Sequence, residues 1–188
     1  NKPSRSDIFI LGGGISGICA AIFAARDGKT VKLLDSLENL GGQIGEFYQC
    51  PMDYDNGFND PFYRESGLFE EICTFLRSEN TEGTYCGQAR ALFSLIKQEP
   101  NVSITLGHHC TDITHSSSKD RIESCTILSH AQQLKYLHRS QYFIDCSISG
   151  ELSKLANAPG DTNKSVNPDL VSNKEDFTRS AVLIEIET

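Results

Sequence analysis

The residues best suited to chemistry form a glycine-rich run near the start of the sequence, Gly12-Gly13-Gly14-Ile15-Ser16-Gly17. Gly12, Gly14 and Gly17 match the pattern GxGxxG. In that pattern the first glycine allows a tight turn, the second lets a pyrophosphate approach the backbone, and the third lets a helix pack closely on a strand. The first turn of the following helix offers free backbone N–H groups to phosphate oxygens. The run therefore predicts a turn that binds the diphosphate of a dinucleotide.

An acidic residue stands where the ribose half of such a site requires one. Asp35 follows Gly17 by 18 residues and ends an expected strand over residues 31–35. A carboxylate at this place accepts hydrogen bonds from both ribose hydroxyls and disfavours a 2′-phosphate, which argues against NADP. The spacing alone leaves both FAD and NAD open. A glycine-rich turn without any ligand is the simpler alternative, and the surrounding elements argue against it.

These residues are positioned by a strand–turn–helix–strand unit. Residues 8–11 are continuously apolar, which is typical of a strand buried on both faces. Apolar residues then recur at helical spacing after Gly17, up to the helix stop at Asp27-Gly28. A second apolar strand ends at Asp35. Together they form a βαβ unit.

The remaining pattern favours an α/β fold, a Rossmann-like three-layer FAD/NAD(P)-binding domain with an antiparallel β-meander as the crossover. Its parallel sheet is expected from strands at 8–11, 31–35, 102–106 and 142–145. Amphipathic helices are expected near 68–76 and 89–96, the meander over 112–138, and a short helix near 152–156. The irregular stretch 36–66 predicts a long functional loop.

The sequence divides at about residue 160. We expect residues 1–160 to form the dinucleotide-binding domain, and residues 161–188 to be a polar linker and the terminal strand of a truncated second domain. The apolar run at 182–186 predicts that strand, and an unpaired strand there favours association. The expected partners are therefore a missing C-terminal domain or, through residues 181–187, a second copy in a homo-oligomer.

Composition excludes several classes of function. With 25 acidic against 17 basic residues the formal charge is −8, which disfavours binding to nucleic acid or anionic lipid. No apolar stretch reaches the length of a membrane span. The seven cysteines are odd in number and lack CxxC spacing, so neither a disulfide framework nor a metal site is expected. This cysteine usage favours the cytoplasm, although a processed signal peptide remains an open alternative because the sequence does not begin with Met.

Several stretches between about Asp7 and Pro159 resemble the FAD-dependent oxidoreductases of the glutathione-reductase type, in a subgroup distantly similar to fumarate-reductase flavoproteins. They are Ser16-Gly17-Ile18-Cys19-Ala20-Ala21, Gly41-Gly42, Tyr63-Arg64-Glu65-Ser66-Gly67, Phe69-Glu70-Glu71 and Glu99-Pro100-Asn101-Val102. The glycine motif is shared by many families, whereas the stretches from Tyr63 onward are more specific. The resemblance implies FAD as the cofactor.

The resemblance also implies roles for individual residues. The glycine turn would lie against the adenosine half of FAD, Asp35 would hold its ribose, and Gly41-Gly42 would lie near the pyrophosphate. Ser147 would replace the threonine hydroxyl of an Ala-Thr-Gly-like signature that follows the last strand. The candidate cofactor-binding residues are Gly12, Gly14, Ile15, Ser16, Gly17, Asp35, Ser36, Gly41, Gly42 and Ser147.

Two residues depart from the family signature. Ile148 stands where the family has a glycine that approaches the cofactor, and Ser149 replaces an acid. These changes are expected to oppose tight binding of FAD. They keep open a second hypothesis, a degenerate or non-catalytic dinucleotide-binding module that acts through protein contacts.

The predicted function is that of the FAD-binding portion of an FAD-dependent oxidoreductase acting on an unknown small molecule. In such enzymes the flavin carries out hydride or electron transfer, and the protein supplies position and electrostatics. No catalytic side chain is assigned for this reason. The resemblance places the substrate domain beyond Thr188, so the chain alone is expected to be incomplete and inactive.

Overall fold

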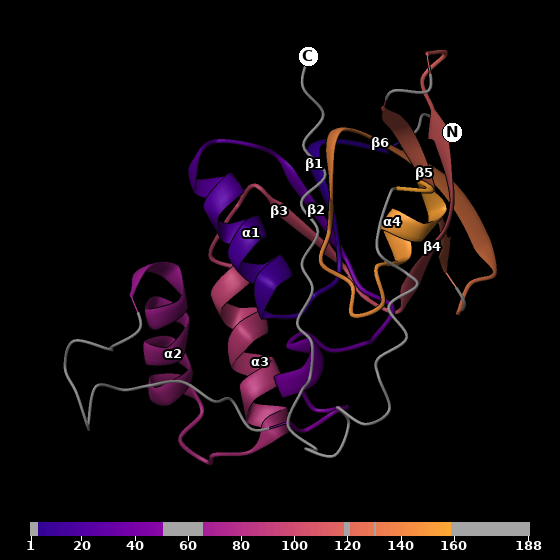
Figure 1. Ribbon diagram of the computed structural model, residues 1–188. Coiled ribbons are helices and arrows are strands. Elements are labelled where there is room, and N and C mark those ends of the chain that lie inside the picture. Colours follow the sequence, from indigo (N-terminus) through magenta and orange to yellow (C-terminus); the bar gives the residue numbers. More distant parts are fainter. Residues whose placement is uncertain (1–3, 51–65, 119–120, 130, 159–188) are drawn as a thin grey trace, which may run out of the picture.

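The computed structural model describes residues 4–50, 66–118, 121–129 and 131–158 (Figure 1). Some predictions lie outside these residues. They concern the second half of the long loop, including Tyr63, Arg64 and Glu65, and the polar linker and terminal strand within 161–188.

A six-stranded mixed sheet forms the centre of the fold, in the order β3-β2-β1-β6-β5-β4. Four strands are parallel: β1 (Ser4–Leu11), β2 (Val31–Leu34), β3 (Val102–Thr105) and β6 (Leu134–Asp145). Strands β4 (His108–His115) and β5 (Ile122–Ser129) lead antiparallel into β6. The predicted parallel strands and the meander crossover between β3 and β6 are both confirmed.

Helices cover the parallel part of the sheet on one face, and the meander lies on the other side (Figure 1). The first face carries α1 (Ile15–Arg26), α2 (Gly67–Glu79) and α3 (Tyr85–Ile96). The short α4 (Glu151–Leu155) contacts β4 and β6, and a 3₁₀ turn, η1 (Gly42–Ile44), follows β2. This arrangement has the three layers that the sequence pattern predicted.

The continuous apolar run of β1 is explained by two separate cores. Ile10 packs with α1, α2 and α3 on one face, whereas Phe9 and Leu11 pack with the meander and α4 on the other. All three side chains are at most 3% exposed. A strand buried on both faces needs apolar residues at every position, and this pattern distinguishes β1 from a half-exposed strand.

Three strands are longer than the sequence indicated. β6 is one strand from Leu134 to Asp145, where two separate runs were predicted. β1 begins at Ser4 and not at Ile8. β4 begins at His108, before the predicted start of the meander at residue 112, so His108 and His109 are partly buried strand residues.

A buried polar network explains why β1 and β6 looked shorter. Ser6 Oγ and Ser140 Oγ lie 2.9 and 3.1 Å from His138 Nε2, and Ser4 Oγ lies 2.7 Å from His138 Nδ1. His138 is only 2% exposed, and its ring lies against Phe9 with the two ring centroids 5.5 Å apart. Polar side chains that satisfy each other here occupy interior positions where the sequence pattern expected apolar ones.

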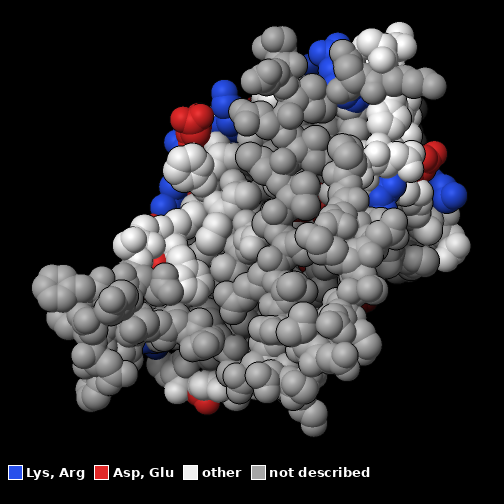
Figure 2. Space-filling model, viewed as in Figure 1, with Lys and Arg blue, Asp and Glu red and all other residues white. Residues whose placement is uncertain are grey.

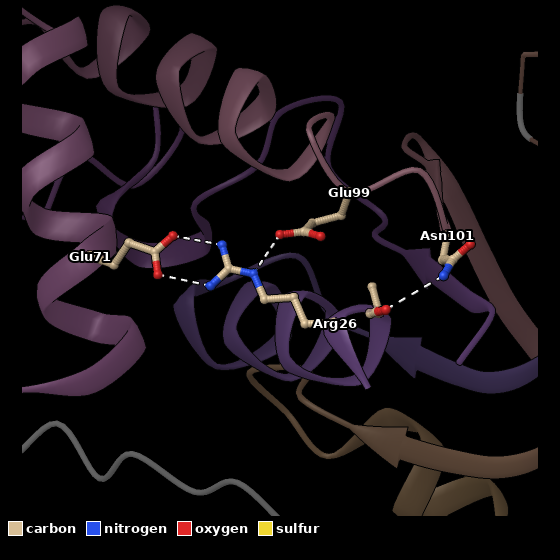
Figure 3. Close-up of polar contacts among 5 residues, drawn as sticks. Arg26, Glu71, Glu99 and Asn101 are labelled. Atoms are coloured by element: carbon tan, nitrogen blue, oxygen red, sulfur yellow. Dashed lines mark hydrogen bonds and ion pairs between the residues drawn. The ribbon is translucent and has the colours of Figure 1, made fainter. Parts of the chain in front are cut away.

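An arginine at the end of α1 links it to α2 and to the segment after α3 (Figure 3). The guanidinium of Arg26 donates to both carboxylate oxygens of Glu71, at 2.6 and 2.8 Å, and to Glu99 at 2.7 Å. The hydrogen bonds from Arg26 lower the pKa of Glu71. Asn101, also drawn in Figure 3, donates to the carbonyl oxygen of Ala25 at 3.5 Å.

Removing the Glu71 charge is expected to have a small effect. Because Arg26 and Glu71 are each about half exposed, Glu71→Gln should lower the free energy of unfolding by less than about 1 kcal/mol, and by less still in high salt. Denaturant titrations at low and high salt measure this, with the exposed Glu79→Gln on the same helix as the baseline. A loss above about 2 kcal/mol, independent of salt, would contradict it.

The described surface carries both signs of charge. On the face shown in Figure 2, acidic and basic side chains are interspersed along the margins. Among the helices of the described residues, none combines the length and apolar character needed to cross a membrane.

Candidate cofactor-binding site

The glycine turn lies at the carboxyl end of β1, and packing requires two of its glycines. A Cβ at Gly17 would lie 1.8 Å from the carbonyl oxygen of Gly12. A Cβ at Gly12, where φ is 110°, would lie 2.3 Å from the carbonyl oxygen of Cys146. The helix α1 and the end of β6 thus approach the turn so closely that neither position has room for a side chain.

Gly14 is different, because the packing of the residues that the structure describes does not require a glycine there. Its backbone is extended, with φ −71° and ψ −179°, a conformation that any residue adopts. Among the described residues, a Cβ at Gly14 would have one neighbour within 4 Å, the Cα of Gly42 at 3.9 Å. A glycine beside open space at a helix N-terminus fits the position where a pyrophosphate approaches the backbone.

The N-terminus of α1 provides donors at this open space. The first intrahelical bond runs from Ile18 N–H to Gly14 O at 2.9 Å, so the N–H groups of Ile15, Ser16 and Gly17 have no acceptor within the helix. Gly14 gives no side-chain cap, and the first turn carries no acid. Ser16 is exposed and Ile15 half-buried. This end of the helix therefore suits a negatively charged group.

Asp35 connects the end of β2 to the glycine turn. Its carboxylate accepts a hydrogen bond from the N–H of Gly13 through Oδ2 and one from Leu37 N–H, at 2.8 Å, through Oδ1. The residue is 8% exposed. Each carboxylate oxygen can accept about two hydrogen bonds, so each retains capacity for a ribose hydroxyl. Ser36, the next predicted residue, is partly exposed beside it.

A second glycine pair forms the opposite wall of the site. Gly41 N–H donates to Gly13 O at 2.9 Å, and Gly41 forms a parallel bridge with Gly14. A Cβ at Gly42 would lie 3.0 Å from the Cα of Gly14. The segment after Asp35 thus lies directly against the glycine turn, and the structure brings both predicted glycine segments together.

Ser147 lies beside the turn, and its hydroxyl forms hydrogen bonds within the protein. Its backbone nitrogen would be 2.7 Å from a Cβ at Gly12. Its hydroxyl donates to Asp145 Oδ1 at 2.6 Å and accepts from Glu151 N–H at 2.8 Å, at the start of α4. These contacts connect β6 to α4.

Asp145 connects the end of β6 to α4, and the sequence analysis did not single it out. It is 2% exposed, and besides Ser147 it accepts the N–H and O–H of Ser153 at 2.8 and 2.9 Å. The sequence signal for this residue is a single acid directly after the apolar run 142–144. Burial and the neighbouring Asp145 raise the pKa of the Cys146 thiol to about 11, so it stays protonated at neutral pH.

The residues that depart from the family signature lie at the edge of the site. Ile148 is 60% exposed, so its side chain is not packed into the turn. Ser149 is also exposed and donates to Glu151 at 3.3 Å.

Comparison with known proteins places this geometry in a family. The family described as FAD dependent oxidoreductase matches residues 7–176. The ferredoxin–NADP reductase of Streptococcus pyogenes is 46% identical over 54 residues, 29% of this chain and 16% of the reductase. The chain therefore matches only a small part of that relative's length.

Solved structures show the same fold at low identity. L-proline dehydrogenase from P. horikoshii gives a TM-score of 0.56 at 12% identity, covering 83% of this chain and 57% of that one. The flavin-dependent monooxygenase PieE, solved with FAD and substrate, gives 0.50 at 13% identity, covering 74% and 29%. The family match, which extends across most of the described fold, confirms the predicted cofactor, FAD. The chain belongs to the FAD-dependent oxidoreductase family.

Proposed function

We propose that this chain holds the ADP part of FAD at the turn from Gly12 to Gly17 and at Asp35, as the FAD-binding portion of an oxidoreductase. The observation that carries the proposal is the open space at Gly14, which the packing of the described residues leaves unexplained. A diphosphate placed there would fill it and would meet the free N–H groups at the start of α1.

Different residues would bind the diphosphate and the ribose. The N–H groups of Ile15, Ser16 and Gly17 would donate to phosphate oxygens, while the remaining lone pairs of Asp35 would accept the ribose hydroxyls. Gly41 and Gly42 would keep the opposite wall free of side chains. Because Asp35 is held by Gly13 and Leu37, the ribose acceptor is already oriented before the cofactor binds.

The proposed reaction is hydride or electron transfer on a small molecule, a chemistry that bound FAD supplies. The chain contributes position, and its backbone N–H groups neutralise the diphosphate. The activity of the whole protein is part of this proposal, because the chain covers only a fraction of its relatives.

A second candidate is a degenerate dinucleotide-binding module that acts through protein contacts. Ile148 and Ser149 favour it, because they replace the family's glycine and acid beside the turn. The double variant Ile148→Gly/Ser149→Asp separates the two. Under the first proposal it binds FAD about as well as the unmodified chain, and under the second only the variant retains flavin.

Asp35→Asn tests the ribose contact. The amide keeps one oxygen acceptor but replaces the other with a donor that faces a backbone N–H or a hydroxyl, so we expect affinity for FAD to fall by about tenfold or more. Visible absorption after incubation with FAD and desalting measures retention. Glu38→Gln, which removes an exposed charge three residues away, is the control and should retain FAD. Equal retention by both variants would contradict the proposed role of Asp35.

A further inference from the structure

The hydrogen-bonded group at the start of β1 has an exposed serine at one end and a buried histidine at its centre. Ser4, the first residue of β1, is exposed. Its hydroxyl oxygen lies 2.7 Å from Nδ1 of His138, its register partner on β6, and His138 is only 2% exposed. A hydroxyl within hydrogen-bond reach of an imidazole, which a third group orients in turn, is the arrangement of an activated nucleophile and its base.

The hydrogen bonds of Ser6 determine which imidazole nitrogen carries the proton. The Ser6 hydroxyl donates its single proton to the carbonyl oxygen of Ile8 at 2.8 Å. Ser6 Oγ therefore accepts from His138 Nε2, 2.9 Å away, which places the ring proton on Nε2. Nδ1 is then the acceptor nitrogen, and the Ser4 hydroxyl donates to it. Ser140 Oγ, 2.8 Å from Ser6 Oγ and 3.1 Å from Nε2, holds the same side of the ring.

The imidazole is an uncharged base at neutral pH. Burial, together with the charge of Lys32 on β2, lowers the pKa of His138 to about 4. Its register partner on β5 is Cys125, whose pKa is raised by a hydrogen bond to Cys110 and by burial, so this thiol carries no charge. An imidazole with a low pKa is a weak base, and it assists best where the leaving group departs easily. The arrangement therefore suits activated esters.

We propose that Ser4 is a nucleophile that takes the acyl group of small activated esters, with His138 as its base. Ser6 and Ser140 are positioning residues, because they hold the ring through Nε2. The Ser4 oxygen bonds to the acyl carbon, and the bond from that carbon to the leaving oxygen breaks. The hydroxyl proton passes to Nδ1 and from there to the leaving group. Water then reacts in the same way, which releases the acid and restores Ser4.

This activity goes beyond the proposed binding of FAD and does not depend on it. Ser4 begins β1, whereas the glycine turn follows the other end of the same strand, about 25 Å away for a strand of 8 residues. Reaction at Ser4 and binding of FAD can therefore be measured separately, and either can fail without the other.

Labelling of the full chain with a fluorophosphonate tests the proposal. The phosphorus of this probe bonds to a nucleophilic hydroxyl oxygen while fluoride leaves, so the adduct marks the reacting residue. At about pH 7.5 we expect Ser4 to be labelled about a hundredfold faster than Ser94, an exposed serine on α3. Mass spectrometry of the peptides measures both rates in one sample, so Ser94 is an internal control.

The variant His138→Gln separates the action of the base from its hydrogen bonds. Glutamine accepts the hydrogen bond of Ser4 but takes up no proton, so labelling of Ser4 should fall by about a hundredfold while that of Ser94 stays the same. The pH profile gives a second readout. Because His138 is already neutral at pH 6, the rate at Ser4 should be nearly equal at pH 6 and pH 8, whereas an unassisted hydroxyl reacts roughly tenfold faster per pH unit.

Two results would overturn the proposal. One is labelling of Ser4 in the unmodified chain no faster than labelling of Ser94, which would leave the serine an ordinary surface hydroxyl. The other is labelling of Ser4 in His138→Gln as fast as in the unmodified chain, which would show that the imidazole takes no proton. If this variant does not fold, the comparison with Ser94 and the pH profile of the unmodified chain decide the question.

Discussion

Gly14→Ala is expected to lower the affinity for FAD by about a hundredfold without destabilising the fold. A methyl group at Gly14 would occupy the open space proposed for the diphosphate and would keep it from the N–H groups of α1. In the part of the chain that the structure describes, the nearest atom beyond its chain neighbours lies 3.9 Å from this methyl group. Because the backbone there is extended, alanine should leave the free energy of unfolding unchanged or raise it by about 0.4–1 kcal/mol. Flavin titration and denaturant unfolding of one variant measure both effects.

Gly17→Ala is the comparison for stability, since, unlike Gly14→Ala, it should destabilise the fold. Its methyl group would lie 1.8 Å from the carbonyl oxygen of Gly12, so α1 would have to move away from the turn. We expect a loss of roughly 3 kcal/mol or more in stability, typical of overpacking a close backbone contact. If Gly14→Ala unfolds the chain like Gly17→Ala, or binds FAD unchanged, Gly14 is not the diphosphate position.

The second large effect is a loss of stability in mild acid, caused by His138. Burial, together with the charge of Lys32, lowers the pKa of this imidazole to about 4. The unfolded chain, with an ordinary pKa near 6.5, then binds the proton more readily than the folded chain between about pH 6.5 and 4. The contribution of neutral His138 is therefore complete above about pH 6.5 and decreases as the pH falls toward 4. It amounts to about 3 kcal/mol.

The variant His138→Gln isolates this effect from the titration of other groups. Glutamine provides hydrogen bonds to Ser4, Ser6 and Ser140 but carries no titrating proton. The difference in free energy of unfolding between the unmodified chain and the variant should shrink by about 3 kcal/mol from about pH 7 to pH 4. A difference that stays constant over this range would show that His138 titrates alike in both states.

The sequence predicted the parts of the fold that local patterns determine. The run 8–11, the glycine turn and Asp35 identified β1, α1 and β2 because each has a strong periodicity or a fixed backbone requirement. The extent of β6 was missed because Arg139, Ser140 and Gln141 interrupt its apolar pattern. Ser140 is partly buried and bonds to Ser6, 134 positions away, a contact that no local pattern shows.

The sequence predicted which residues form the candidate site better than it predicted what each of them contacts. GxGxxG and its acid could be read directly, and the motif predicts a different role for each of Gly12, Gly14 and Gly17. The structure separates Gly14 from the two glycines that packing requires. Ser147 is assigned to the cofactor by resemblance alone, and the structure adds that its hydroxyl donates to Asp145 and accepts from Glu151 N–H. Such distinctions depend on contacts between the ends of β1, β2 and β6, which only the folded chain brings together.

The central claim is that this chain recognises the ADP part of FAD, and calorimetric titration with FAD, ADP and FMN tests it most directly. FMN carries the flavin ring and one phosphate but lacks the adenosine. We expect FAD and ADP to bind at one shared site, with ADP displacing FAD, and FMN to bind far more weakly. Binding of FMN as tight as that of FAD, with no competition from ADP, would place the recognition elsewhere and contradict the claim.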